Sequence, residues 1–455
     1  MILVSVFAAA SVINVGAEGF PAGVSPYYFT AVLIAFRTIP KWLSGRLSFR
    51  AGDPARVYLR VMAVFIGWAS LSAFLLPIIF QGLPVDLARA GPDATYYFRL
   101  PLQWSLSNAG QAGYLILDLI VITYFAGQAA TPGCAEALAA AFCWSGVVVV
   151  AIGAYQLLAH KAGLPFPSTF FNSNPAWAQL SGQNIGGVWR VSATFDEPSA
   201  AGAFFATWTV FEFSLALSRA RNRLRHQIFA LAGILMVIAT TSTTGYLTLA
   251  AMAPLLLLND LFSALRQTRS LMPASVAIAA AVIAIAFAFA RAGAGSSLLD
   301  AVVLYKYQSS SSMHRMATVF RSINIFASTW GLGAGLGSNR AMSIVAYILS
   351  NLGVVGIVLF VWLLISLRTI TRIEMGAMPR DAHSRLLLRA LGWAFAAHLL
   401  AMSESAAEIS DPSLWILWSI LMVSVRRQWL ITHQAAQDPA HISIFADCPR
   451  QAAVY

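Results

Sequence analysis

The most concentrated set of reactive side chains lies in Gly186–Gly202, whose sequence is GGVWRVSATFDEPSAAG. It holds one arginine, Arg190, and two adjacent acids, Asp196 and Glu197, and the small residues after Pro198 suit the start of a helix. A carboxylate at such a position can take a proton from an attacking hydroxyl, and it can equally be a helix cap or a partner of the helix dipole. In a chain that is otherwise mostly apolar, this compact ionisable group predicts a reactive site.

A second ionisable group lies in residues 291–341, where five basic residues accompany a single acid, Asp300. The basic residues are Arg291, Lys306, Arg315, Arg321 and Arg340. Arginine's rigid fork suits phosphate, although a solvated helix whose arginines pair with lipid headgroups is an alternative. Ser309–Ser312 can cap a helix beginning near Met313, on which His314 and Arg321 share a face. Together the two groups predict one catalytic site for an anionic, lipid-linked substrate.

A glycine-rich segment, Gly331-Leu-Gly-Ala-Gly-Leu-Gly337, follows this group and precedes Ser338, Asn339 and Arg340. Glycines let backbone N–H groups approach an anion closely. There is no Walker lysine and no preceding strand, which excludes a nucleotide-binding loop. For the glycines alone we favour a flexible connection into the span that begins at Ser343.

Aromatic and amide side chains alternate in residues 161–198. The aromatic residues are Phe166, Phe170, Phe171, Trp177 and Trp189, and the amides are Asn172, Asn174, Gln179, Gln183 and Asn184. Aromatic faces beside amides suit sugar rings, and they equally suit the interfacial belt of a membrane protein, where tryptophan is enriched. Both interpretations stay open.

The composition indicates which elements must carry these groups. Of the 455 residues, 58% are hydrophobic and 10% are charged, and apolar runs near the length of a bilayer span recur along the chain. This pattern predicts an all-α polytopic membrane protein. The net charge of +11 is explained by arginines gathered in cytoplasmic loops, so we expect no nucleic-acid partner. Cys134, Cys143 and Cys448 form no metal or redox motif.

About twelve transmembrane helices are expected, with both termini cytoplasmic and two large outer loops, 161–198 and 291–341. The expected spans are Ile2–Gly16, Ser25–Ile39, Val61–Phe80, Asn108–Gln128, Ala137–His160, Ser199–Leu217, Gln227–Ala239, Gly245–Leu258, Met272–Ala290, Ser343–Leu367, Leu386–Met402 and Ser413–Val425. Most of the 29 Lys and Arg residues fall in inner segments, chiefly in 37–60, 219–225 and 368–389. A single integral-membrane domain then covers residues 1–425, and a polar cytoplasmic tail covers 426–455.

Three ionisable residues fall inside expected spans: Asp118, Glu212 and His398. Such residues often belong to proton relays in transporters. They are scattered here, and a hydrogen bond between helices explains each one, so we favour a structural role.

These residues point to a family. The segment Arg190-Val-Ser-Ala-Thr-Phe-Asp-Glu-Pro-Ser resembles the Arg–x–x–G–T–F–x–x–P segment of the O-antigen ligase/polymerase family. Arg315 in a long outer loop, followed by Gly331-x-Gly-x-Gly-x-Gly-Ser and by Asn351-Leu-Gly-Val-Val-Gly, is similar to the second half of that family. The match covers residues 186–202 and 309–356, together with the twelve-span layout.

The resemblance implies a metal-independent glycosyltransferase of the bacterial inner membrane, with a GT-C-like architecture, a periplasmic active site and no cofactor. Donor and acceptor would both be glycans on undecaprenyl pyrophosphate, and chain-length regulators and export proteins are further partners. Arg190 and Arg315 would bind the pyrophosphate and stabilise charge on the leaving group. Glu197 or Asp196 would be the base at the acceptor hydroxyl. His314, Arg321, Arg340 and Trp189 would contact the substrate.

Two departures from the family pattern bear on the activity. Ligases that attach glycan to lipid A core carry a histidine just after the glycine-rich segment, and Ser338–Tyr347 has none. This favours a polymerase of exopolysaccharide or O-antigen repeat units, with a ligase as the nearest alternative. The turn Ser242-Thr243-Thr244-Gly245 stands where the family often has Ser-Arg, so it receives no role. A transporter or flippase is the alternative from another class, and it would carry repeat symmetry and functional charges within its spans.

Overall fold

The computed structural model describes residues 1–17, 20–47, 49–87, 98–175, 180, 182–185, 188–218, 222–266, 310–379, 382–405 and 408–437. Among these residues, nine helices are long and apolar enough to cross a bilayer. They are α3 (Pro54–Ile79), α4 (Leu106–Gly127), α5 (Cys134–Ala162), α7 (Pro198–Leu217), α8 (Arg223–Thr240), α9 (Thr243–Arg266), α14 (Ile344–Ala377), α15 (His383–Ser405) and α16 (Pro412–Gln437). The chain is therefore a mostly helical, multi-pass membrane protein, as its composition predicts.

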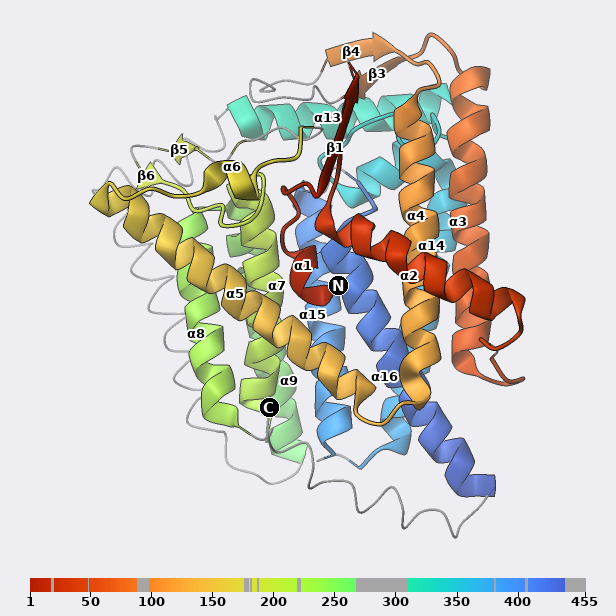
Figure 1. Ribbon diagram of the computed structural model, residues 1–455, viewed down its shortest axis with the longest axis vertical. Coiled ribbons are helices and arrows are strands. Elements are labelled where there is room, and N and C mark those ends of the chain that lie inside the picture. Colours follow the sequence, from red (N-terminus) through yellow and green to blue (C-terminus); the bar gives the residue numbers. More distant parts are fainter. Residues whose placement is uncertain are drawn as a thin grey trace.

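Figure 1 shows these helices running between two ends of one bundle. Helix α13 (Ser310–Ser328) lies across the upper end, which also carries the antiparallel hairpins β1–β2 and β3–β4. The strands are β1 (Ile13–Ala17), β2 (Phe20–Val24), β3 (Pro84–Leu87) and β4 (Phe98–Pro101), and a third hairpin pairs β5 (Asn184–Ile185) with β6 (Val188–Trp189). We call the opposite end the basic end.

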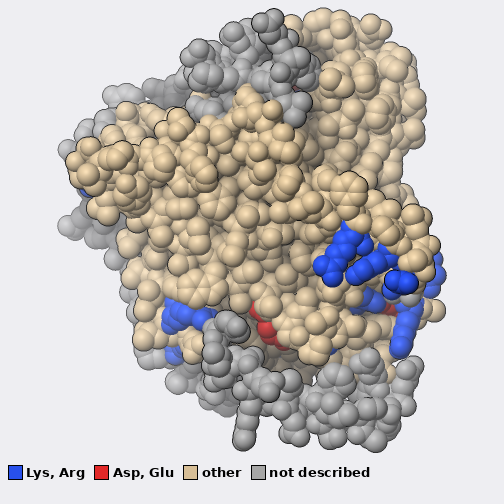
Figure 2. All heavy atoms as spheres, in the orientation of Figure 1, with Lys and Arg blue, Asp and Glu red and all other residues tan. Residues whose placement is uncertain are grey.

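Lys and Arg side chains gather toward the basic end. Figure 2 shows them mainly over the connection from α2 (Pro26–Leu43) to α3, in the lower part of the face drawn. This arrangement agrees with the positive-inside rule, because the basic segments 37–60 and 223–225 lie at the same end of the bundle. Which side of which membrane each end faces stays a prediction.

Helix α7 lies at the centre of the bundle, and all its residues except Ala200 are buried. It packs against α8, α9 and α15. Small residues allow this close packing: a Cβ added to Gly245 would lie 3.1 Å from the carbonyl oxygen of Gly202. The upper end of this central helix carries Asp196 and Glu197, so the packing of α7 fixes the position of both acids.

A buried ion pair joins three elements at the basic end. Asp53 caps α3 by accepting a hydrogen bond from the amide of Ala55 at 2.9 Å, and its other oxygen accepts from Nε of Arg426 at 2.8 Å. Nη1 of Arg426 donates to the carbonyl oxygen of Ala126 at 2.6 Å, and the guanidinium lies 4.3 Å from the ring centre of Phe49. This pair connects α3, α4 and α16.

The expected first span, Ile2–Gly16, is wrong. Ile2–Ser5 form only the short helix α1, and Ile13–Ala17 form strand β1, paired with β2. The segment is too short to span as a helix, and its β-branched residues around Ile13 favour a strand. The prediction that both termini are cytoplasmic counted this segment as one of twelve membrane crossings, and that crossing is absent.

Two further expected spans are not among the nine membrane-spanning helices of the described residues. Ser25–Ile39 is helical as part of α2, but α2 is not among the helices long and apolar enough to span. Met272–Ala290 lies outside the described residues, as do 291–309 of the second outer loop. The number twelve thus stays a prediction. Helix α16 continues to Gln437, so the expected polar tail begins as helix, and its residues 438–455 lie outside the described part of the chain.

Candidate active site

Arg190 is buried at the upper end, between β6 and α7. Its Nε atom donates to the carbonyl oxygen of Thr240 at 3.0 Å, and Nη1 donates to Oε1 of Gln183 at 2.6 Å. Thr240 is the last residue of α8, so the guanidinium lies at the negative end of that helix's dipole. Arg190 therefore caps α8, a role that the sequence pattern does not reveal.

The backbone after Arg190 is held between α5 and α8. Oε1 of Gln156, on α5, accepts hydrogen bonds from the amides of Ser192 at 3.1 Å and Ala193 at 2.8 Å. The amide of Val191 donates to the carbonyl oxygen of Ala239 at 3.1 Å. Ala193 has a φ of 52°, a left-handed conformation that an alanine keeps only where its surroundings enforce it. This segment is therefore rigidly placed, and so are the side chains it carries.

Asp196 and Glu197 stand at the start of α7, where Glu197 is the N-cap residue and Pro198 the first helical residue. Glu197 accepts a hydrogen bond from the hydroxyl of Ser199. Burial raises the pKa of Asp196 to about 7, the charge of Glu197 adds to the rise, and Arg340 opposes it. Asp196 can therefore gain or lose a proton near neutral pH.

Charged residues of the two loops that the sequence assigned to one site act on each other electrostatically. Burial lowers the pKa of Arg190 to about 10, the carboxylate of Glu197 opposes this, and the positive charge of Arg315 adds to it. Arg315 lies on α13 and is half-buried, and its Nη1 atom is 3.5 Å from the carbonyl oxygen of Glu404, on α15. Arg190, Glu197 and Arg315 thus share one electrostatic neighbourhood.

Arg321 has a structural partner. Its Nε atom lies 3.0 Å from Oδ2 of Asp86, which is buried on β3. The backbone of Asp86 binds the glycine-rich region as well: its carbonyl oxygen accepts from the amide of Arg340 at 2.8 Å, and its amide donates to Oδ1 of Asn339 at 3.0 Å. Arg321 and Asp86 therefore tie α13 and β3 to the segment that carries Arg340.

The glycine-rich segment fills a break in α14. The helix is interrupted at Gly353, where φ is 66°. The carbonyl oxygens of Ser350 and Asn351 accept instead from the amides of Ala334 at 2.7 Å and Gly335 at 2.9 Å, and the amide of Val354 donates to Gly331 at 2.8 Å. Backbone groups freed by a break at membrane depth need such partners.

This segment is closely packed, so the expectation of a flexible connection is wrong. Gly333 and Gly335 have φ values of 86° and 100°, and a Cβ on Gly335 would lie 2.7 Å from the carbonyl oxygen of Ser72. Oδ1 of Asn351 accepts from the amides of Ser338 at 3.1 Å and Asn339 at 2.9 Å. The backbone amides of Ala334, Gly335, Ser338 and Asn339 donate hydrogen bonds within the protein, so these four do not bind an anion. The segment contributes to the site by fixing the position of Arg340.

Arg340 lies beside an acid that the sequence analysis left out. Its Nη1 atom is 3.9 Å from Oε1 of Glu408, in the connection between α15 and α16, and each side chain is 29% exposed. The positive charge of Arg340 also lowers the pKa of Asp196, just before α7. The connection between α15 and α16 therefore adds a carboxylate beside one of the arginines predicted to bind the substrate.

The expected aromatic and histidine contacts have mixed outcomes. Trp189 stacks on His160, with ring centres 4.4 Å apart, and Phe171 stacks on Phe166 at 5.5 Å. The first contact packs the loop against the end of α5, and the second lies within the loop. Trp177 lies outside the described residues, as does the side chain of His314, whose backbone belongs to α13.

Asp86, Glu404 and Glu408 are the neighbours that sequence reasoning missed. Residues 402–412 hold three acids and no Lys or Arg, and the positive-inside rule gives acids little weight, so that rule does not single out this segment. An acid-only loop in a chain with a net charge of +11 is the signal that could have identified it.

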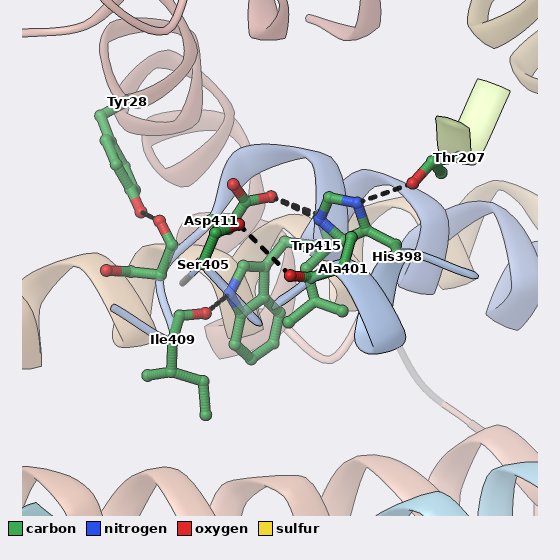
Figure 3. Close-up of polar contacts among 10 residues, drawn as sticks. Tyr28, Thr207, His398, Ala401, Ser405, Ile409, Asp411 and Trp415 are labelled. Carbon is green, nitrogen blue, oxygen red and sulfur yellow. Dashed lines mark hydrogen bonds and ion pairs between the residues drawn. The ribbon is translucent and has the colours of Figure 1, made fainter. Parts of the chain in front are cut away.

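The three ionisable residues within spans bridge helices, as the sequence analysis favoured. The hydroxyl of Tyr27 donates to Oδ1 of Asp118 at 2.8 Å, and Nδ1 of His226 lies 2.6 Å from Oε2 of Glu212. His398 lies between Thr207 and Asp411, with Nδ1 3.1 Å from the Thr207 hydroxyl, as Figure 3 shows.

Among the described residues, no cluster of three or more His, Cys, Asp or Glu side chains could hold a metal ion. Comparison of the chain with models of known protein families finds no match, and comparison with curated protein sequences finds none either.

Proposed function

We propose that this protein polymerises lipid-linked oligosaccharide repeat units of an exopolysaccharide or O-antigen. It would transfer the glycan from undecaprenyl pyrophosphate to the acceptor sugar hydroxyl of another lipid-linked unit, at the periplasmic face of a bacterial inner membrane. This proposal is supported by the electrostatic interaction of Arg190 with Arg315, which lies far away in the sequence, and with the carboxylate of Glu197.

The chemistry needs a group that binds the leaving pyrophosphate and a group that accepts a proton. Arg190 and Arg315 supply two positive charges for the pyrophosphate. The acceptor oxygen forms a bond to the anomeric carbon of the donor, the bond from that carbon to the pyrophosphate breaks, and the pyrophosphate leaves with the electron pair. The hydroxyl proton passes to a carboxylate.

Asp196 suits the role of that base better than Glu197. A general base works best when its pKa lies near the working pH, and the pKa of Asp196 is about 7. Glu197 is the N-cap residue of α7 and already accepts from Ser199. We therefore assign proton transfer to Asp196, and assign to Glu197 an electrostatic interaction with Arg190.

The test is gel sizing of lipid-linked and cell-surface glycans from cells that lack the gene and carry wild-type, Arg190→Ala or Arg315→Ala protein. We expect both variants to lose long polymer, with single repeat units accumulating on the lipid. Arg372→Ala, an exposed change on α14, is the matched control and should restore polymer. Both site variants must be checked for membrane levels equal to wild type.

The same gels separate the alternatives. Long lipid-linked chains that never reach an acceptor would indicate a ligase. Unchanged glycans in both arginine variants would remove the polymerase proposal and favour a transporter or flippase.

A further inference from the structure

A group of basic side chains surrounds the connection between α2 and α3, at the basic end. Its members are Arg37, Lys41, Arg46, Arg50, Arg56 and Arg60. Lys41 and Arg56 are half-buried, and the other four are exposed. Figure 2 shows Lys and Arg side chains gathered over this connection. We call this group the basic patch, and its like charges repel one another unless anions lie nearby.

The basic patch has no acidic partner in the fold. Within the part of the chain that the structure describes, none of its side chains forms an ion pair or donates a hydrogen bond. The single acid in residues 37–60, Asp53, is buried and paired with Arg426. Arg223, at the same end, does have a partner, because its Nε atom donates to the carbonyl oxygen of Ala216 at 3.1 Å. The described fold thus supplies no counter-charge for the basic patch.

The connection that carries the patch is held in place. The amide of Leu47 donates to the carbonyl oxygen of Lys41 at 3.0 Å, which turns the chain and places Arg46 beside the end of α2. The side chain of Leu47 packs against the end of α4, where a Cβ added to Gly127 would collide with it. The connection ends at Asp53, which caps α3. The cations are therefore presented from a packed segment.

Helix α2 adds an exposed apolar face beside these charges. One side of α2 packs against α4, and Figure 1 shows it running obliquely across the bundle. The other side carries exposed apolar residues at the spacing of a single helical face: Val32, Phe36, Ile39 and Leu43. Arg37 and Lys41, four residues apart, follow one edge of this face. An apolar helical face flanked by cations is typical of a helix that contacts the headgroup region of a membrane.

We propose that the basic patch and the exposed face of α2 together bind an anionic phospholipid of the surrounding bilayer. The headgroup phosphate contacts Arg37, Lys41 and Arg46, and an acyl chain lies along Phe36 and Leu43. A bilayer lipid uses both the cations and the apolar face, whereas a soluble anion uses the cations alone. The site lies at the opposite end of the bundle from the candidate active site, so it does not depend on the proposed function.

The test uses the purified full-length protein in phosphatidylcholine vesicles that contain phosphatidylglycerol. Phe36→Trp places a fluorescent reporter on the exposed face, and subtraction of wild-type emission isolates its signal. Brominated acyl chains quench tryptophan on contact, so brominated forms of the two lipids give the ratio of their binding constants at this face. We expect phosphatidylglycerol to be preferred by about 20-fold at about 0.1 M salt, and the ratio to approach one at about 1 M salt, where charges are screened.

Paired substitutions in this reporter protein locate the site. Arg37→Gln with Lys41→Gln should lower the ratio by about 20-fold, because each cation near an anionic surface contributes roughly a factor of five. Arg37→Lys with Lys41→Arg retains both charges and should retain the ratio. Arg368→Gln with Arg372→Gln is the matched control, since these two arginines are exposed and four residues apart on α14. It should leave the ratio unchanged.

Four results would overturn the proposal. Equal quenching by the two lipids would show that the face does not select for charge, and no quenching by either would show that lipid does not reach it. An equal fall in both glutamine pairs would show that any cations suffice. Displacement of the lipid by millimolar glycerol phosphate would assign the patch to a soluble anion. Should thermal unfolding show that Arg37→Gln with Lys41→Gln is not folded, Arg46→Gln with Arg50→Gln, both exposed on the connection, takes its place with the same expected fall.

Discussion

The guanidinium of Arg190 donates through Nε to the carbonyl oxygen of Thr240 at 3.0 Å, and this one contact joins the candidate site to the end of α8. The side chain that is proposed to bind pyrophosphate therefore also stabilises the bundle. A variant of Arg190 must be judged on both properties, and a lysine separates them because it retains the charge and loses the fork.

We expect Arg190→Lys to abolish long polymer and to lower the free energy of unfolding by about 1–3 kcal/mol, because a single ammonium cannot replace the contacts to Thr240 and Gln183 together. Gel sizing and thermal unfolding in detergent measure the two effects. Arg372→Lys, exposed on α14, should change neither. Normal polymer in Arg190→Lys would show that a positive charge suffices at this position.

Polymerisation should depend on the protonation of Asp196. Its pKa is raised to about 7, so the carboxylate that accepts a proton is present above that pH and is lost as the pH falls below it. We expect the initial rate with lipid-linked repeat units in proteoliposomes to fall on the acid side of pH 7. In Asp196→Asn the rate should be about 100-fold lower above pH 7, and the fall on the acid side should disappear. An unchanged acid limb in that variant would assign the limb to another group.

Gly335→Ala should destabilise the protein, because Gly335 has a φ of 100° and a new Cβ would lie 2.7 Å from the carbonyl oxygen of Ser72. Strain and overpacking together cost about 1–3 kcal/mol, measured as a lower unfolding temperature. Gly67→Ala is the matched control, since Gly67 lies within α3 and a Cβ there meets nothing within 4 Å. The control should be as stable as wild type or more so. Equal stability of both variants would contradict the close packing of the glycine-rich segment.

Arg426→Met should lower the free energy of unfolding by about 3–5 kcal/mol, because it leaves the buried charge of Asp53 without its partner. Asp53→Asn combined with Arg426→Met should recover much of this loss, because asparagine can still cap α3. Chemical unfolding in mixed micelles compares wild type, Arg426→Met, Asp53→Asn and the double variant. Additive losses in the double variant would show that the two side chains stabilise the bundle independently.

Several helices were predictable because their signals are local. The spans around α3, α7 and α14 follow from apolar runs that a bilayer requires. Arg190 and Arg315 stood out because topology offers no reason for arginines in outer loops. That the two loops form one site was expected from this shared excess of charge; the structure adds that the charge of Arg315 acts on Arg190.

The errors have physical causes too. Ile2–Gly16 was expected to span because its residues are apolar, but apolar residues also form strands when β-branching and length favour them. The glycine-rich segment was expected to be flexible because glycine has conformational freedom. In the fold that freedom is used to reach positive φ values where Gly333 and Gly335 pack against Asn351 and Ser72.

The amino-acid sequence by itself determined that the chain is helical, crosses a membrane several times and carries an excess of basic residues toward one end, because span length and charge are properties of short stretches. Only the tertiary structure decided which carboxylate neighbours which arginine. Arg321 pairs with Asp86 and Arg340 with Glu408, and each pair joins segments far apart in the chain. Such contacts depend on how helices pack and where a break such as that at Gly353 is filled, and no short stretch of sequence contains that information.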